Sequence, residues 1–202
     1  MPYSTSLISR FESSISQVDE LLAIHRYLQS APVTQVTDNI LRAALTMMVS
    51  AIDTSVHELI INAIIFEIRE DQSIFSIDKI KIPISTLKVS DSEIRLKLIE
   101  SELRLQYTKE SFQSSKKIES ALATIGIKKV WTKLSDILDK PPESIKKTLD
   151  LLVRRRNQIV HEGDLDHLHN LREIQREDLD NSLLFTKELV HGVIYEYRKL
   201  IP

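Results

Sequence analysis

The sequence predicts an all-α domain, a helical bundle of five to seven helices around one long central helix. Glycine occurs three times in 202 residues, where average usage would give about fourteen, and proline is also sparse, at six. A chain with so few glycines has few tight turns, no glycine-rich phosphate loop and little room for βαβ crossovers. Along most of the chain, apolar residues recur at steps of three and four, the helical period. These observations disfavour a dinucleotide-binding fold, a P-loop enzyme and a β-sandwich.

Length and cysteine usage bound the class further. A chain of this length suits one domain, so residues 1–202 are expected to form a single unit. The absence of cysteine excludes disulfides, thiolate metal sites and a cysteine nucleophile. No basic run followed by an apolar core opens the sequence, and the longest apolar stretch, Leu59 to Phe66, is far shorter than the ~20 residues that span a bilayer. We therefore expect a cytoplasmic protein without membrane contact.

The first half of the chain predicts two long helices and an extended connection. The first helix is expected over residues ~4–29 of an N-terminal segment 1–34, and the second, the longest and most apolar, over ~35–70. Between residues 73 and 90 the apolar residues alternate with polar ones around Pro83. This pattern indicates an extended connection or at most an edge strand.

Helical periodicity returns in the second half. The expected helices cover 91–107, 115–125, a short stretch around Trp131, the segment 143–164 and a last helix from Glu177. Gly126 and Gly163 suit helix C-terminal ends, and Pro142 suits a first helical turn.

Charge is unevenly distributed along the chain, although the formal net charge is only −2. Residues 101–160 hold 13 Lys and Arg against 7 Asp and Glu, a balance of +6, while the flanking regions 1–100 and 161–202 are each at −4. A basic block in a mildly acidic chain is typical of a polyanion-binding surface, because lysine and arginine make the phosphate contacts. Solvated helix faces explain it equally well.

Arg156 is the anomalous residue of the helix expected over 143–164. It projects to about the centre of that helix's apolar face, where an unpaired buried charge costs several kcal/mol. Either Arg156 is paired inside the fold, or part of this face lines a polar cleft. Arg154, Arg155 and Arg156 cannot all share one role, because three consecutive residues fan over ~200° of the helix surface.

Asn157 and His161 lie four residues apart on one flank of the same helix. With Arg156 they combine a fixed cation, an amide and an imidazole that titrates near neutrality. The spacing alone is weak, because chance supplies about 0.4 such Arg/His pairs in this composition. On an ideal helix Arg156 and His161 point ~140° apart. They meet only if the arginine swings round, the helix loosens near Gly163, or a second subunit contributes its copy.

One run in this helix closely resembles the signature of the HEPN domain family, which is an arginine, a polar residue, three further residues and a histidine near a helix end. The run is Arg155-Arg156-Asn157-Gln158-Ile159-Val160-His161-Glu162-Gly163-Asp164. Three other segments are similar to the RiboL-PSP-HEPN subgroup: Phe112-Gln113, Ile125-Gly126 before Trp131, and Met47 to Asp53. The resemblance covers most of residues 40–200.

The resemblance implies metal-independent cleavage of RNA by a homodimer, with two Arg/His sets meeting in a cleft at the subunit interface. RNA supplies the nucleophile, its 2′-hydroxyl, and the products carry 2′,3′-cyclic phosphate and 5′-hydroxyl ends. His161 would be the general acid/base, Arg156 would stabilise transition-state charge, and Asn157 would position the phosphate or orient His161. No cofactor is implied. Many members are toxins restrained by a partner, so a toxin or phage-defence role with a cognate antitoxin is expected on the same basis.

Five further residues are supporting candidates, namely Arg154, Arg155, Glu162, Asp53 and His57. Either of the first two could be the catalytic arginine, because each precedes His161 by one or two more residues than Arg156 does. Asp53 and His57 lie four residues apart on the second helix. Either they support the same cleft, or they are a helix-stabilising pair or simple boundary polarity.

No metal site is expected. His167 and His169 lie near Asp164 and Asp166, but this spacing on a loop is not a recognised ligand arrangement.

Three functions compete on this sequence. The leading one is an endoribonuclease of HEPN type. The second is a non-catalytic helical module that binds RNA, a nucleotide or a partner protein, and the third is a plain dimerisation module. Substitution of His161 separates them, because it abolishes cleavage under the first and leaves binding intact under the second. Under the third, neither Arg156 nor His161 matters except for folding.

Overall fold

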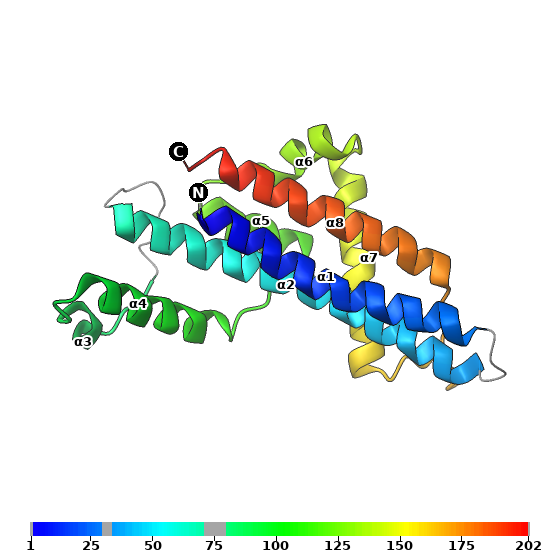
Figure 1. Ribbon diagram of the computed structural model, residues 1–202. Helices are drawn as coiled ribbons and strands as arrows, with labels where there is room; N and C mark the ends of the chain where they lie inside the picture. Colours follow the sequence, from blue (N-terminus) through cyan, green and yellow to red (C-terminus); the bar gives the residue numbers. More distant parts are fainter. Residues whose placement is uncertain (1, 30–33, 71–79, 202) are drawn as a thin grey trace.

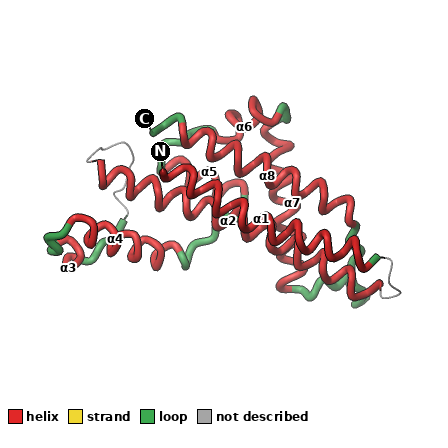
Figure 2. The backbone as a smooth tube through the Cα atoms, in the orientation of Figure 1, coloured by secondary structure: helices red, strands yellow, loops and turns green. Residues whose placement is uncertain are grey.

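The computed structural model of the protein describes residues 2–29, 34–70 and 80–201. Within these residues it contains eight α-helices and no strand. They are α1 (Pro2–Leu28), α2 (Thr34–Glu70), α3 (Ile84–Leu87), α4 (Ser92–Tyr107), α5 (Ser115–Thr124), α6 (Val130–Leu138), α7 (Pro142–His161) and α8 (Arg176–Arg198). The all-α class is confirmed, and the helix beyond the expected five to seven is α3, a single turn of four residues. Short loops join most helices (Figure 2).

The 37-residue helix α2 is the centre of the bundle. It packs against α1, α4, α5, α7 and α8, and Figure 1 shows α1 and α8 running along it while α7 crosses the long helices steeply. Leu41, Met48, Ile52 and Leu59 of α2 are completely buried. By length and apolar composition Thr37–Glu70 also passes for a membrane-crossing helix, but 61% of its most apolar window is buried inside the structure. That burial is the behaviour of a core helix.

The alternating segment before α4 is only partly extended. Residues 73–79 of the expected connection lie outside the described residues, as do Ala31 and Pro32, near which the sequence predicts the end of the first helix. Within the described part of the chain, no strand pairs with residues 80–83. Instead, the side-chain amide of Gln106 donates to the Lys81 carbonyl and accepts from the Lys81 N–H at 3.3 Å. The expectation of an extended chain over all of 73–90 is therefore wrong at α3, where the Thr86 N–H donates to the Pro83 carbonyl at 3.0 Å and closes a helical turn.

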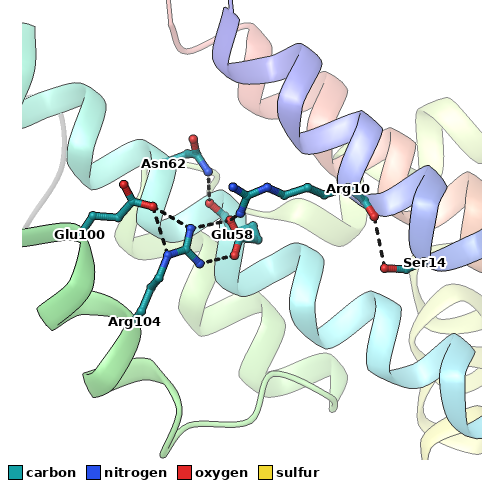
Figure 3. Close-up of polar contacts among 6 residues, drawn as sticks. All are labelled: Arg10, Ser14, Glu58, Asn62, Glu100 and Arg104. Carbon is teal, nitrogen blue, oxygen red and sulfur yellow. Dashed lines mark hydrogen bonds and ion pairs between the residues drawn. The ribbon is translucent and has the colours of Figure 1, made fainter. Parts of the chain in front are cut away.

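A cluster of charges holds α1 and α4 against α2 (Figure 3). Glu58 on α2 has a side chain only 10% exposed. It binds Arg10 from α1 and Arg104 from α4, with 3.0 Å between Arg104 Nη2 and Glu58 Oε2. Arg104 also binds Glu100 one turn earlier on α4. Burial alone would raise the pKa of Glu58, but the hydrogen bonds from Arg104 and the charges of both arginines outweigh it, so this pKa is lowered.

Replacement of Glu58 by glutamine should destabilise the fold by about 2 kcal/mol near neutral pH, because it leaves two arginines without their shared carboxylate. A carboxyl whose folded-state pKa is lowered stabilises the fold above its unfolded value of about 4.5, and the contribution disappears as pH falls through the folded value. Urea denaturation of E58Q should therefore show a weaker loss of stability below about pH 4.5 than the wild type shows.

The matched control is E100Q, which removes a more exposed carboxylate from the same arginine. It should cost less than 1 kcal/mol. An E58Q variant as stable as the wild type at neutral pH would contradict this account of the α1–α2–α4 junction.

Candidate functional site

Helix α7 begins at Pro142 and ends at His161, and a turn over 162–164 completes the expected segment 143–164. Pro142 stands in its first turn, and the helix ends at His161 with Glu162 as its C-cap. Gly163 follows with φ of +63°, the left-handed conformation that glycine adopts without a steric penalty. The Glu162 N–H and the Asp164 N–H both donate to the Gln158 carbonyl, at 3.0 and 2.9 Å. The motif residues therefore lie on the last two turns of a well-terminated helix.

Asp164 is a buried carboxylate held between two arginines. It is 1% exposed. Its Oδ2 accepts from Arg42 Nε of α2 at 2.6 Å and from Arg155 Nη2 of α7 at 3.0 Å, and Arg155 Nη1 binds its Oδ1. Arg42 and Arg155 also donate to the carbonyls of Arg172 and Glu173 in the loop before α8. The bridge thus ties α2, α7 and this loop together.

This bridge gives Arg155, one of the supporting candidates, a structural role. Both oxygens of Asp164 occupy its guanidinium, and the Glu173 carbonyl takes a further N–H. Sequence reasoning missed Asp164 as a structural centre. Its only local signal is its place directly after Gly163, and nothing in the spacing indicates Arg42, which is 122 positions away.

Arg156 lies on the core-facing side of α7, as the periodicity predicts, close to the line of the buried residues Leu149 and Leu152. Its Nη1 donates to Asn157 Oδ1 at 3.1 Å. Its Nε is buried and has no hydrogen-bond partner. Within the described residues no carboxylate pairs with Arg156, so the fold leaves its charge uncompensated. The structure therefore does not show the first of the two alternatives for Arg156, in which its charge is paired inside the fold.

An open groove of about 490 Å³ runs along the other side of α7; we call it the α7 groove. Its lining residues are Ser114, Asp150, Val153, Arg154, Asn157, Gln158, Glu162 and Arg172. Three of the candidates, Arg154, Asn157 and Glu162, therefore meet there. His161 is exposed on the last turn of α7, between Gln158 and Glu162, which both line the groove.

Arg156 and His161 do not converge within one chain. Helical geometry places Arg154 and His161 within about 20° of each other and Arg156 about 140° from His161. Among the described residues no hydrogen bond joins Arg156 to His161, and Arg156 does not line the α7 groove. The first two sequence alternatives for bringing them together are not realised, because the arginine does not swing round and α7 stays helical to His161.

Asp53 and His57 lie apart from the α7 groove, and no hydrogen bond joins their side chains in the described structure. Asp53 accepts from the Phe112 N–H at 2.6 Å and from Gln113 Nε2 at 3.2 Å. The His57 ring stands edge-on to Phe112, with 4.6 Å between centroids, and near Tyr107. These two residues therefore secure the connection between α4 and α5. They touch the site only indirectly.

The same connection is anchored from α7. The side chain of Asp150 accepts from the Ser115 N–H at 2.9 Å and from Ser115 Oγ at 2.8 Å. The chain between Phe112 and Ser115 is thus held by carboxylates on two helices, Asp53 and Asp150, and its Ser114 forms one wall of the α7 groove. The sequence carries no signal for Asp150 in this role.

The loop with His167 and His169 shows no ligand set. Among the described residues, no group of three or more His, Cys, Asp or Glu side chains is placed to hold a metal ion. Asp166 Oδ1 accepts from the backbone N–H groups of Leu168 and Asn170, at 2.8 and 2.9 Å. These hydrogen bonds, that of Asn170 foremost, lower the pKa of Asp166 against the effect of desolvation.

An all-α bundle with an arginine, a polar residue and a histidine on the last turns of one helix agrees with the HEPN signature to which the sequence is similar. The chain belongs to the RiboL-PSP-HEPN family, whose sequence model matches residues 12–196. This match begins inside α1, so the first helix is part of the family domain, although the sequence motifs trace the resemblance only from about residue 40. HEPN domains are often RNases, and they often bind RNA and dimerise. No curated protein and no solved structure matches the chain.

Replacement of Asp164 by asparagine should cost about 3 kcal/mol of stability, because it leaves Arg42 and Arg155 without their buried counter-charge. Asparagine tolerates the φ of +59° at this position, so the loss reports the charge and not backbone strain. Chemical denaturation of D164N measures it.

The control for this experiment is E173Q in the same loop, where the carboxylate is exposed and, among the described residues, accepts only from Gln175. Its stability should stay within about 0.5 kcal/mol of wild type. Equal stabilities of D164N and E173Q would contradict the role of the bridge.

Proposed function

We propose that this protein is a metal-independent endoribonuclease of the HEPN type, in which Arg156, Asn157 and His161 act on the RNA backbone. The observation that carries the proposal is that neighbouring side chains at the end of α7 differ in whether a carboxylate pairs with them. Arg155 is neutralised by Asp164, whereas Arg156 has no carboxylate partner within the described residues and His161 is exposed without one. A cation and an imidazole that the fold does not use are what a phosphodiester reaction needs.

The proposed reaction needs no nucleophile from the protein. A histidine takes the proton of the RNA 2′-hydroxyl, and O2′ attacks the adjacent phosphorus. The bond to O5′ breaks, and a second acid protonates the leaving oxygen. The products are a 2′,3′-cyclic phosphate and a 5′-hydroxyl. Arg156 stabilises the additional negative charge of the phosphorane-like transition state through its forked donors, and Asn157, already bonded to Arg156, orients that guanidinium.

The active form in this proposal is a homodimer. The directions of Arg156 and His161 on α7 support it, because one chain presents them on different sides of the helix. A second copy would bring His161 of one chain to Arg156 of the other.

We extend the proposal to the cellular role of the protein by analogy with its family. Cleavage of the cell's own RNA would make the protein a cytoplasmic toxin or phage-defence effector, and such an enzyme needs a partner protein that restrains it. This part rests on the family membership of residues 12–196 alone.

The test is incubation of the purified protein with labelled RNA in the presence of EDTA. The wild type should cut RNA and leave cyclic-phosphate ends, while H161A and R156A should each lose at least about a hundredfold in rate, the usual worth of acid–base or oxyanion stabilisation. Circular dichroism must show both variants folded.

The matched control is H167A, which removes an exposed histidine from the neighbouring loop and should keep wild-type activity. Cleavage that EDTA abolishes, or that survives in H161A, would refute the proposed mechanism.

A further inference from the structure

The α7 groove continues toward the start of the helix. A second open hollow, of about 510 Å³, shares Asp150 and Arg154 with the first. Its full lining is Ser115, Glu143, Lys146, Lys147, Asp150, Leu151 and Arg154. The two hollows form one polar channel along α7, and we call it the extended α7 groove.

Each acidic side chain of this channel has a partner. Asp150 is occupied by the backbone and hydroxyl of Ser115. Glu143 binds Lys146 at 2.9 Å, and Glu162 lies 3.8 Å from Arg172. Neighbouring cations therefore compensate the charges of Glu143 and Glu162, while Asp150 is hydrogen-bonded to the neutral Ser115.

Two cations of the groove have no such partner. Arg154 and Lys147 are exposed, line the groove, and make no hydrogen bond or ion pair with any described residue. They are seven residues apart, which places them within about 20° of each other on α7 and about 10 Å apart along its axis. The next step of seven residues ends at His161. Lys147, Arg154 and His161 therefore form one row along the helix.

We propose that the extended α7 groove binds the phosphodiester backbone of single-stranded RNA beside the scissile bond, with Arg154 and Lys147 each holding one phosphate. The identity of the polymer rests on the proposed function. A step of about 10 Å is covered by about three nucleotides at the duplex rise of 3.4 Å and by fewer in an extended strand. The row thus leads one strand toward His161.

The arrangement favours a single strand over a duplex. Both unpartnered cations lie in one line on one helix, so they follow one backbone, whereas a duplex presents two. In-line attack by a 2′-hydroxyl also requires a backbone free to leave the A-form geometry. The open polar walls, which include Ser114 and Gln158, leave room for unpaired bases without selecting one base over another.

The test uses a fluorescent single-stranded oligouridylate with 2′-O-methyl groups, which cannot be cleaved by 2′-hydroxyl attack. Fluorescence anisotropy at several salt concentrations measures its affinity. R154Q and K147Q should each weaken binding about tenfold and reduce the slope of log K against log salt by about 0.7, the value for one lost phosphate contact on a single strand. K128Q, which removes a lysine outside the groove from the same basic segment, should change neither.

Three results would overturn the inference: wild-type affinity in R154Q and K147Q, an equal loss in K128Q, or equal affinity for a duplex of the same length. The assay involves no cleavage, so its outcome is independent of the proposed function. On cleavable RNA, R154Q should raise KM and leave kcat unchanged; a fall in kcat alone would place Arg154 at the scissile phosphate and contradict its assignment here. If the wild-type protein binds RNA through the groove but cleaves no RNA, the result would refute the nuclease proposal and support RNA binding in the extended α7 groove.

Discussion

The buried carboxylate of Asp164 is the constraint on which the site depends. It neutralises Arg42 of α2 and Arg155 of α7 at once, and it lies in the turn that follows α7. Because successive helix residues point 100° apart, the direction of Arg155 toward Asp164 determines those of its neighbours. Arg154 then faces the α7 groove and Arg156 faces the core side. One ion bridge therefore gives three consecutive arginines three different environments.

The distribution of polar partners separates architecture from chemistry in this protein. Glu58, Asp53, Asp150 and Asp164 each hold another element by hydrogen bonds or ion pairs. Two groups proposed for RNA chemistry, Arg156 and His161, have no carboxylate partner among the described residues of this network. Uncompensated charge costs stability, and strained or unsatisfied groups concentrate at functional sites for that reason.

Local signals in the sequence predicted most of the helices and the face of Arg156. Pro142 and Gly163 mark the ends of α7 because their backbone preferences act within a turn, and the helical period places Arg156 on the core side. The failures are non-local. The alternation of apolar and polar residues before α4 resembles a strand pattern, but the Gln106 side chain, and not a partner strand, forms hydrogen bonds with the backbone of Lys81. The Arg42–Asp164 pair spans 122 positions, and the anchoring of the α4–α5 connection by Asp53 depends on how two distant segments pack.

We propose that Arg156 and His161 complete one another only across two chains. The most direct measurement joins an R156A chain and an H161A chain in a heterodimer, isolated through two different tags and assayed on RNA with EDTA present. Such a dimer contains one intact composite site and one doubly impaired site, so it should recover about half of the wild-type activity although each homodimer is inactive. A heterodimer as inactive as its parents would contradict the account, because it would show that both residues must come from the same chain.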